Sequence, residues 1–174
     1  MTRPVRIDPA IAVIGGFINA LKNAFTPEQP TPPDGGGTKD VRFFASEGPP
    51  LEAWNAYAED TDCAGPFIWV RVVRRYRSQR FPEPIINVNP CQIDTVIALE
   101  IGVARCAAID LNTSWDDYAR QADVSLDDSW RIEQALCEAT NALKQDHQIG
   151  VDTIVPFGPE GGILGWSAQA YIQL

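Results

Sequence analysis

The stretch at residues 94–106, DTVIALEIGVARC, constrains the fold of this chain more than any other. One face of an extended backbone here carries an almost wholly aliphatic row: Thr95, Ile97, Leu99, Ile101 and Val103. The other face carries mainly small or polar residues: Val96, Ala98, Glu100, Gly102 and Ala104. Because side chains alternate between the two faces of a strand, this pattern predicts a strand that covers a hydrophobic core. Its length and regularity predict the central strand of a sheet.

A second strand is predicted at residues 66–80, PFIWVRVVRRYRSQR. Simple alternation places Arg71 and Arg75 on one face and Arg74 on the other, and both faces change from apolar to basic along the strand. A connection to the stretch at 94–106 follows, shaped by three prolines: Pro82, Pro84 and Pro90. The two strands are therefore expected to lie next to each other, most simply antiparallel.

An amphipathic helix is predicted at residues 8–25. Asp8 and Pro9 suit a helix start, because an acceptor side chain caps the first turn and proline fits within it. Apolar residues then recur every three or four positions: Ile11, Ile14, Ile18, Leu21 and Phe25, with Val13 and Phe17 widening the stripe. Gly15 and Gly16 each cost about 1 kcal/mol relative to alanine, so this helix needs a surface to pack on.

Residues 26–40 are expected to form a flexible linker between that helix and a body at 41–174. The segment holds four prolines and three consecutive glycines, which leave few hydrogen bonds and few side chains to pack. The glycines at 35–37 lack the lysine and serine or threonine of a phosphate-binding loop and do not follow a strand. The linker would let the first helix swing away from the body or dock on another subunit.

The remaining pattern predicts one domain over residues 1–174. A short strand is expected at 41–45, a brief helical turn around Trp54 and Tyr57, and strands at 151–157 and 163–174. Two helical segments are expected between them, one capped by Ser114 and one starting at a capping box of Ser125 and Asp128. The fold class is therefore α+β, with a mostly antiparallel sheet of about four to six strands and helices packed on one face.

The charges are unevenly distributed. The chain has 14 basic and 23 acidic residues, a formal charge of −9, which argues against a protein that coats nucleic acid. Segment 71–80 nevertheless holds five basic residues and no acid: Arg71, Arg74, Arg75, Arg77 and Arg80. These arginines either dock on an acidic face of a second copy or a partner, or contact nucleic acid that passes nearby. Docking is favoured, because arginine is enriched at protein interfaces.

The sequence predicts no metal site, no cofactor and no catalytic set. The four cysteines lack the close pairs of a zinc site and are expected as buried free thiols, although an even count also permits disulfides: Cys63, Cys91, Cys106 and Cys137. The aspartates between 116 and 128 do not match a calcium loop and are expected to cap helices and face solvent. His147 is expected at a helix end. An enzyme would need a site assembled from distant residues such as Asp94, Glu100, Arg105 and His147.

Two further features bear on location. No signal peptide opens the chain, and the apolar run at 11–25 is interrupted and falls short of a membrane span. We therefore expect a cytosolic protein in a reducing compartment, without a membrane partner.

The order of elements resembles that of the tail terminator proteins of long-tailed bacteriophages. The resemblance is carried by the N-terminal helix, the strand IALEIGVARC, the long helix SWRIEQALCEATNALKQ and the closing strand GILGWSAQAYIQL, in which Gly165, Trp166 and Ser167 are the one echo at residue level. The proline- and tryptophan-rich composition is reminiscent of phages that infect actinobacteria. Residues 26–65 have no counterpart, and no functional residue is carried over.

The resemblance implies a non-enzymatic virion protein. In that family, α/β subunits assemble into a hexameric ring that caps the tail tube and joins the tail to the head. The implied partners are further copies of the chain, the tail tube protein and head-completion proteins, with a passing contact to genomic DNA. The implied location is the neck of the virion, and the host cytoplasm during assembly.

Three alternatives stay open. Another head–tail connector or head-closure protein would also lack chemistry. A small enzyme would depend on His147 and the acids named above. A nucleic-acid-binding module would show a steep salt dependence that is lost when Arg74 and Arg75 are neutralised.

Overall fold

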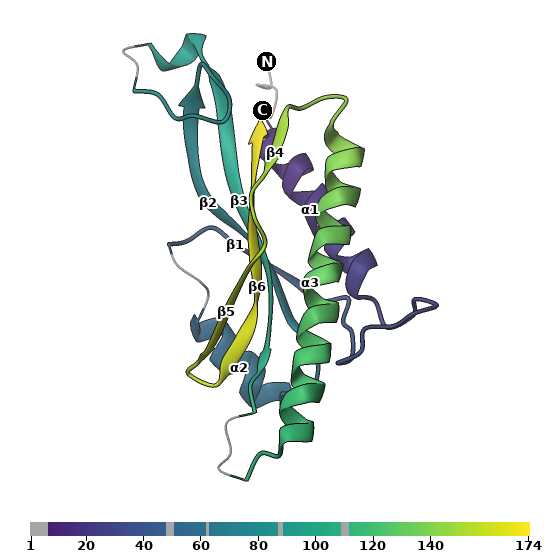
Figure 1. The fold of residues 1–174 in the computed structure, drawn as a ribbon. Coiled ribbons are helices and arrows are strands. Elements are labelled where there is room, and N and C mark those ends of the chain that lie inside the picture. The colour runs from purple at the N-terminus through teal and green to yellow at the C-terminus, as the bar shows by residue number, and fades with distance from the viewer. Residues whose placement is uncertain (1–6, 48–50, 62, 87–88, 109–111) are drawn as a thin grey trace, which may run out of the picture.

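Strand β3 (Asp94–Cys106) lies at the centre of a six-stranded sheet and has the bounds that the sequence predicts (Figure 1). The computed structural model describes residues 7–47, 51–61, 63–86, 89–108 and 112–174. Strands β2 (Phe67–Ser78) and β6 (Ile163–Gln173) flank β3, and both run antiparallel to it. The predicted pairing of the two strongest strands is confirmed.

The sheet is completed by three short strands at its two edges. β1 (Val41–Phe44) pairs in parallel with β2 at one edge. β4 (Ile149–Val151) and β5 (Val155–Glu160) both pair with the outer edge of β6, antiparallel to it. The expected single strand at 151–157 is therefore two strands, and Ile154 between them packs against the core. The mostly antiparallel α+β fold is confirmed.

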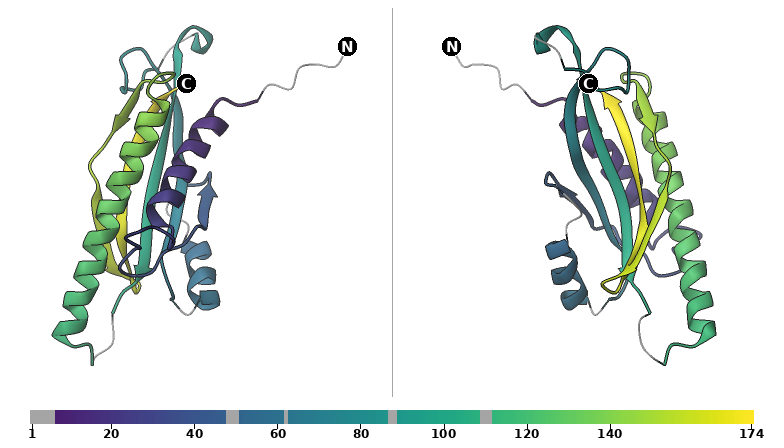
Figure 2. Two further views of the ribbon diagram at one scale, coloured as in Figure 1. Left: turned by 90° about the vertical axis from the view of Figure 1, so that its right-hand side faces the viewer. Right: turned by 60° about the vertical axis from the view of Figure 1, so that its left-hand side comes forward.

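Two long helices lie side by side on one face of the sheet, α1 (Ala10–Phe25) and α3 (Trp115–Leu143) (Figure 2). The main hydrophobic core lies between them and the sheet. Its largest fully buried side chains come from both helices and from three strands: Val13, Phe17, Leu21, Phe25, Ile68, Val70, Ile97, Leu99, Ile101, Ile132 and Ile172. One core therefore holds the N-terminal helix and the body together.

Helix α1 buries most of the predicted stripe, but its buried side is rotated so that Ile11 is left outside the core. Ile11 is 61% exposed, and the buried side is centred on Phe17 and Leu21. The cause is the neighbouring helix: Asn23 donates a hydrogen bond to Glu138 of α3, and Gly16 approaches Leu143. Because α3 occupies that side, the isoleucines are turned toward β1.

The segment at 26–40 is held against the body rather than hanging free. Arg131 of α3 donates hydrogen bonds to the carbonyl oxygens of Ala24 and Thr31, at 2.9 and 3.1 Å. Arg105 donates to the carbonyl of Gly36 at 3.0 Å, and a Cβ on Gly35 would lie 2.4 Å from Val124. The glycine run therefore serves close approach, and the expected freedom of α1 is not what the structure shows.

Helix α2 (Leu51–Thr61) replaces the brief turn expected around Trp54. It packs on the other face of the sheet, where Trp54 meets Phe67 edge-on with ring centroids 5.8 Å apart. Trp69 lies next to Phe67 in this second cluster and crosses β3 above Gly102. Both faces of β3 are therefore covered at this end.

Helix α3 is one continuous helix where two segments were expected. The predicted cap is confirmed: Ser114 accepts a hydrogen bond from the Asp117 amide at 3.1 Å, and Asp117 accepts one from the Ser114 amide at 3.2 Å. The Ser114 hydroxyl also donates to the Asp117 carboxylate at 2.7 Å, and this bond, together with the one from the Ser114 amide, lowers the pKa of Asp117. The second capping box is wrong, because Ser125 accepts a hydrogen bond from Trp166 and Asp128 binds Arg105.

Gly102 gives a direct test of this packing. A Cβ at this position would lie 2.2 Å from the Trp69 ring. We expect Gly102→Ala to lower the free energy of unfolding by about 1–3 kcal/mol, measured by urea denaturation. Gly15→Ala is the matched control, because a Cβ there meets nothing within 4 Å and should stabilise the helix by up to about 1 kcal/mol. An unchanged stability of Gly102→Ala would contradict the position of Trp69.

Candidate interaction surfaces

The five arginines of segment 71–80 do not share one surface. A β-bulge between Val72 and Arg74 shifts the register, so that Arg74 pairs with Ala98 and Arg75 with Ile97. Because Ile97 faces the helices, Arg75 and Arg77 lie on the helix-covered face, whereas Arg71 and Arg74 lie on the opposite face. The predicted alternation, with Arg71 and Arg75 on one face, is therefore wrong after the bulge.

Arg71 is part of the interior and is not a docking residue. It is 8% exposed and forms a two-pronged ion pair with Glu100, with Nε–Oε1 at 3.1 Å and Nη2–Oε2 at 2.7 Å. Its Nη1 donates to the carbonyl of Ser46, and Trp69 donates its indole N–H to the same Glu100 carboxylate. This arginine therefore ties β2 to β3 from within.

The other four arginines differ in whether their side chains are bound to other groups of the protein. Arg75 binds both carboxylate oxygens of Asp8 at 2.8 and 2.6 Å, and this bond is the main reason that the pKa of Asp8 is lowered. Arg77 donates to the Ile93 carbonyl and to the Thr95 hydroxyl. Arg74, over the ring of Tyr76, and Arg80 are exposed and have no carboxylate partner among the described residues. Only these two match the free cationic surface that the sequence predicts.

The four residues considered for an enzyme site are not brought together. Glu100 is occupied by Arg71 in the middle of β3, and Asp94 accepts a hydrogen bond from Gln173 at 2.7 Å. The Nδ1 atom of His147 lies 2.9 Å from the Gln173 carbonyl oxygen. Arg105 is near the other end of β3, about 35 Å away from Asp94 at the rise of a strand.

Arg105 and Asp128 form a buried pair that the sequence analysis missed. Arg105 Nε lies 2.6 Å from Oδ2 of Asp128, and Nη2 lies 2.8 Å from Oδ1. Asp128 is 1% exposed, and this burial raises its pKa although Arg105 opposes the effect. The signal in the sequence is spacing: Asp128 falls in phase with the core residues Ile132 and Ala135, whereas we expected it to face solvent.

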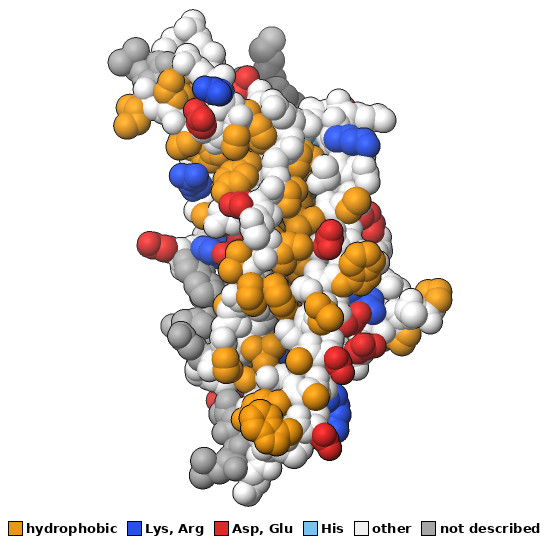
Figure 3. Space-filling view, viewed as in Figure 1, with side chains coloured by type: hydrophobic (Ala, Val, Ile, Leu, Met, Phe, Trp, Pro, Cys, Tyr) orange, Lys and Arg blue, Asp and Glu red, His pale blue; other side chains and the backbone are white. Residues whose placement is uncertain are grey.

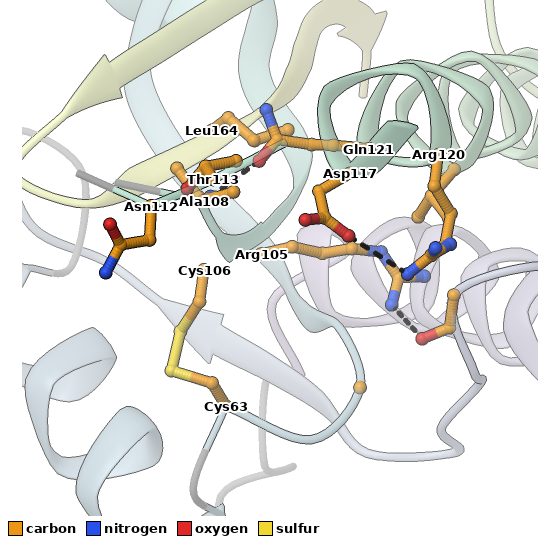
Figure 4. Close-up of a pocket in the computed structure, with 14 residues that line it drawn as sticks. Cys63, Arg105, Cys106, Ala108, Asn112, Thr113, Asp117, Arg120, Gln121 and Leu164 are labelled. Carbon is orange, nitrogen blue, oxygen red and sulfur yellow. Dashed lines mark hydrogen bonds and ion pairs between the residues drawn. A yellow bond between two sulfur atoms is a disulfide. The ribbon is translucent and has the colours of Figure 1, made fainter. Parts of the chain in front are cut away.

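A cavity of about 580 Å³ opens beside this pair, between the end of β3 and the start of α3 (Figure 4). Its polar lining is already engaged: Gln121 accepts a hydrogen bond from the Ala108 amide at 2.6 Å, and Arg120 lies 3.4 Å from Asp117. Arg105 is held by Asp128 and the backbone of 35–36. Among the described residues that line the cavity, no buried polar side chain is left without a partner.

The cysteine prediction is wrong. Cys63 and Cys106 form a disulfide with their Cα atoms 5.8 Å apart, which joins the turn before β2 to the end of β3. Cys91 and Cys137 are free but exposed. The pairing depends on how distant parts of the chain meet, so the spacing of the cysteines did not reveal it.

The α3 surface is an exposed apolar stripe on the side of α3 that faces away from the core. We define it by four side chains with large exposed fractions: Trp115 (87%), Tyr118 (42%), Leu126 (67%) and Trp130 (56%). The intervals between them are three, eight and four residues, which at about 3.6 residues per turn keeps all four on one side of the helix. A shallow groove of about 360 Å³ continues this surface between α3 and β4, lined by Leu136, Cys137 and Val151 among others.

Figure 3 shows this side of the molecule, with hydrophobic side chains along the boundary between the sheet edge and α3 and on α3 itself. A large apolar residue would be expected in the core, but the Trp130 side chain is exposed. Exposed aromatic side chains in a row are typical of a surface that binds another protein.

Comparison with protein-family models and with curated proteins finds no match to this chain. Within the described ranges, no helix is long and apolar enough to cross a membrane. The same part of the chain contains no group of three or more histidine, cysteine or acidic side chains placed to hold a metal ion.

The buried pair predicts a large effect of removing one partner. We expect Arg105→Met to lower the free energy of unfolding by about 3–5 kcal/mol, because it leaves Asp128 charged and unpaired. Adding Asp128→Leu should recover part of this loss. The loss should be smaller near pH 4 than at neutral pH, because the raised pKa of Asp128 lets it take up a proton as the pH falls.

Urea denaturation at both pH values measures these effects. Arg120→Met is the control, because the Arg120 side chain is 74% exposed and its removal should cause no clear change. Equal effects of Arg105→Met and Arg120→Met would contradict a buried pair.

The disulfide predicts a defined thiol count. The unfolded, unreduced protein should have two reactive thiols, Cys91 and Cys137, and reduction should raise the count to four. Replacing Cys63 and Cys106 by serine opens a connection across 43 residues and should cost on the order of 4 kcal/mol in the chain-entropy model. Replacing Cys91 and Cys137 instead should leave stability unchanged. Four reactive thiols before reduction would contradict the disulfide.

Proposed function

We propose that this protein is a phage tail terminator, a virion assembly protein whose subunits form a ring that caps the tail tube and joins it to the head. The observation that carries this proposal is the α3 surface. Three of its four side chains are more than half exposed, and two of those are tryptophans. Exposing such side chains to water is unfavourable in free energy, and binding a partner that covers them removes this penalty.

The arrangement of elements supports the same function. The resemblance predicts a subunit in which a sheet is flanked by an N-terminal helix and a long helix and closed by a final strand. In this chain α1 and α3 cover one face of the sheet, and β6 pairs with β3 along its whole length. This agreement concerns the fold and supports the proposal without identifying the position in the neck.

The internal use of polar groups also favours an assembly role. Glu100, Arg105 and Arg71 are each engaged in ion pairs that join elements of the fold. A nucleic-acid-binding module has less support, because only Arg74 and Arg80 of the five arginines are exposed without a carboxylate partner within the described ranges. A connector elsewhere in the neck is the second candidate, since it would use the same apolar surface.

Mass and shape in solution test the proposal. We expect light scattering to give a mass near six times 19.1 kDa and negative-stain images to show annular particles. A protein that remains monomeric at high concentration, alone and with tail tube protein, would contradict a tail terminator. Binding of a head-side protein by that monomer would instead favour the connector.

A further inference from the structure

A second apolar surface lies on the opposite side of the molecule from the α3 surface. We define this α1–β1 surface by three exposed side chains: Ile7 (73%), Ile11 (61%) and Phe43 (48%). Ile14 and Ile18 are half-buried on the same side of α1. Phe43 shares with Val41 the face of β1 on which α1 lies, and Figure 2 shows β1 beside α1.

The order of the strands separates the two surfaces. The sheet runs β1-β2-β3-β6-β4, so β1 and β4 are its opposite edges. α1 packs over β1 and β2, whereas α3 packs over β6 and β4. The α3 surface and the α1–β1 surface therefore belong to helices that cover opposite edges of the sheet.

The charges around the two surfaces are complementary. Exposed acids accompany the apolar stripe of α3, namely Asp116, Asp123 and Glu133, and its exposed Arg120 is paired with Asp117. On the α1–β1 side, Lys22 of α1 is exposed without an ion-pair partner among the described residues, and Arg75 is paired with Asp8. Arg42 and Arg74 belong to the same edge of the sheet but project from its other face. An acidic apolar side and a more basic apolar side attract each other between copies, and like sides repel.

We propose that the α3 surface of one copy binds the α1–β1 surface of the next copy, head to tail. This inference rests on the proposed function, because it specifies the contact by which copies of the chain would assemble. A contact between two different surfaces is a heterologous interface. In an open row of copies, the first copy has one of these surfaces uncovered and the last copy has the other uncovered. Such contacts continue until a rotation closes the ring.

Two exposed substitutions test the pairing in the full-length chain. Leu126→Asp places a charge in the α3 surface, and Ile11→Asp places one in the α1–β1 surface near the start of α1, where an acid suits the helix. Ile86→Asp is the matched control, because Ile86 is fully exposed in the connection between β2 and β3, on neither surface. Thermal unfolding followed by circular dichroism should show that all three variants are folded.

The decisive measurement is the mass of a mixture. We expect each of Leu126→Asp and Ile11→Asp alone to be a monomer of 19.1 kDa, while Ile86→Asp assembles like the unmodified protein. Leu126→Asp retains an intact α1–β1 surface, and Ile11→Asp retains an intact α3 surface. An equal mixture should therefore give dimers of about twice 19.1 kDa and nothing larger.

Other results would overturn the proposal. If Ile11→Asp assembles normally and Leu126→Asp does not, the α3 surface binds a copy of itself or another protein. If both variants still form rings, the two surfaces are not the contact, although the tail terminator proposal stands. If the unmodified protein forms filaments or short chains that both variants abolish, the head-to-tail contact stands and the ring does not. If the unmodified protein stays monomeric and the mixture gives no dimer, both proposals fail.

Discussion

A buried ion pair between Arg105 and Asp128 connects the main parts of this fold. Arg105 is at the end of β3 and Asp128 is in α3, and the same guanidinium also binds the backbone of the segment at 35–36. Arg105 therefore connects the sheet, helix α3 and the segment at 26–40 through one side chain. Buried charges are costly to leave unpaired, so this contact constrains how the three parts are placed relative to one another.

The distribution of polar and apolar side chains follows from this construction. Charged groups such as Arg71 and Glu100 are used inside to join strands, while Trp115, Leu126 and Ile11 remain in solvent. An isolated domain gains nothing from that exposure. The two apolar surfaces at opposite edges are the ones that the proposed head-to-tail contact would cover.

The fold was predictable where local pattern and burial agree. The strand at 94–106 alternates regularly, and the structure places it at those bounds in the centre of the sheet. The prediction holds for most of the stripe on α1 and fails for Ile11, which is exposed because α3 occupies the side on which Asn23 and Gly16 lie. Hydrophobic periodicity gives the existence of a helix, but the neighbours that pack against it decide which side is buried.

The sequence by itself determined the central strand, its antiparallel neighbours, the α+β class and the cap at Ser114. It did not determine the interaction surfaces, because those depend on contacts between distant residues. A single bulge after Val72 placed Arg71 and Arg75 on different faces, and the pairing of Cys63 with Cys106 followed from the approach of the turn before β2 to the end of β3. Only the tertiary structure decided which apolar residues the core leaves exposed, since a core of limited size covers one side of each helix.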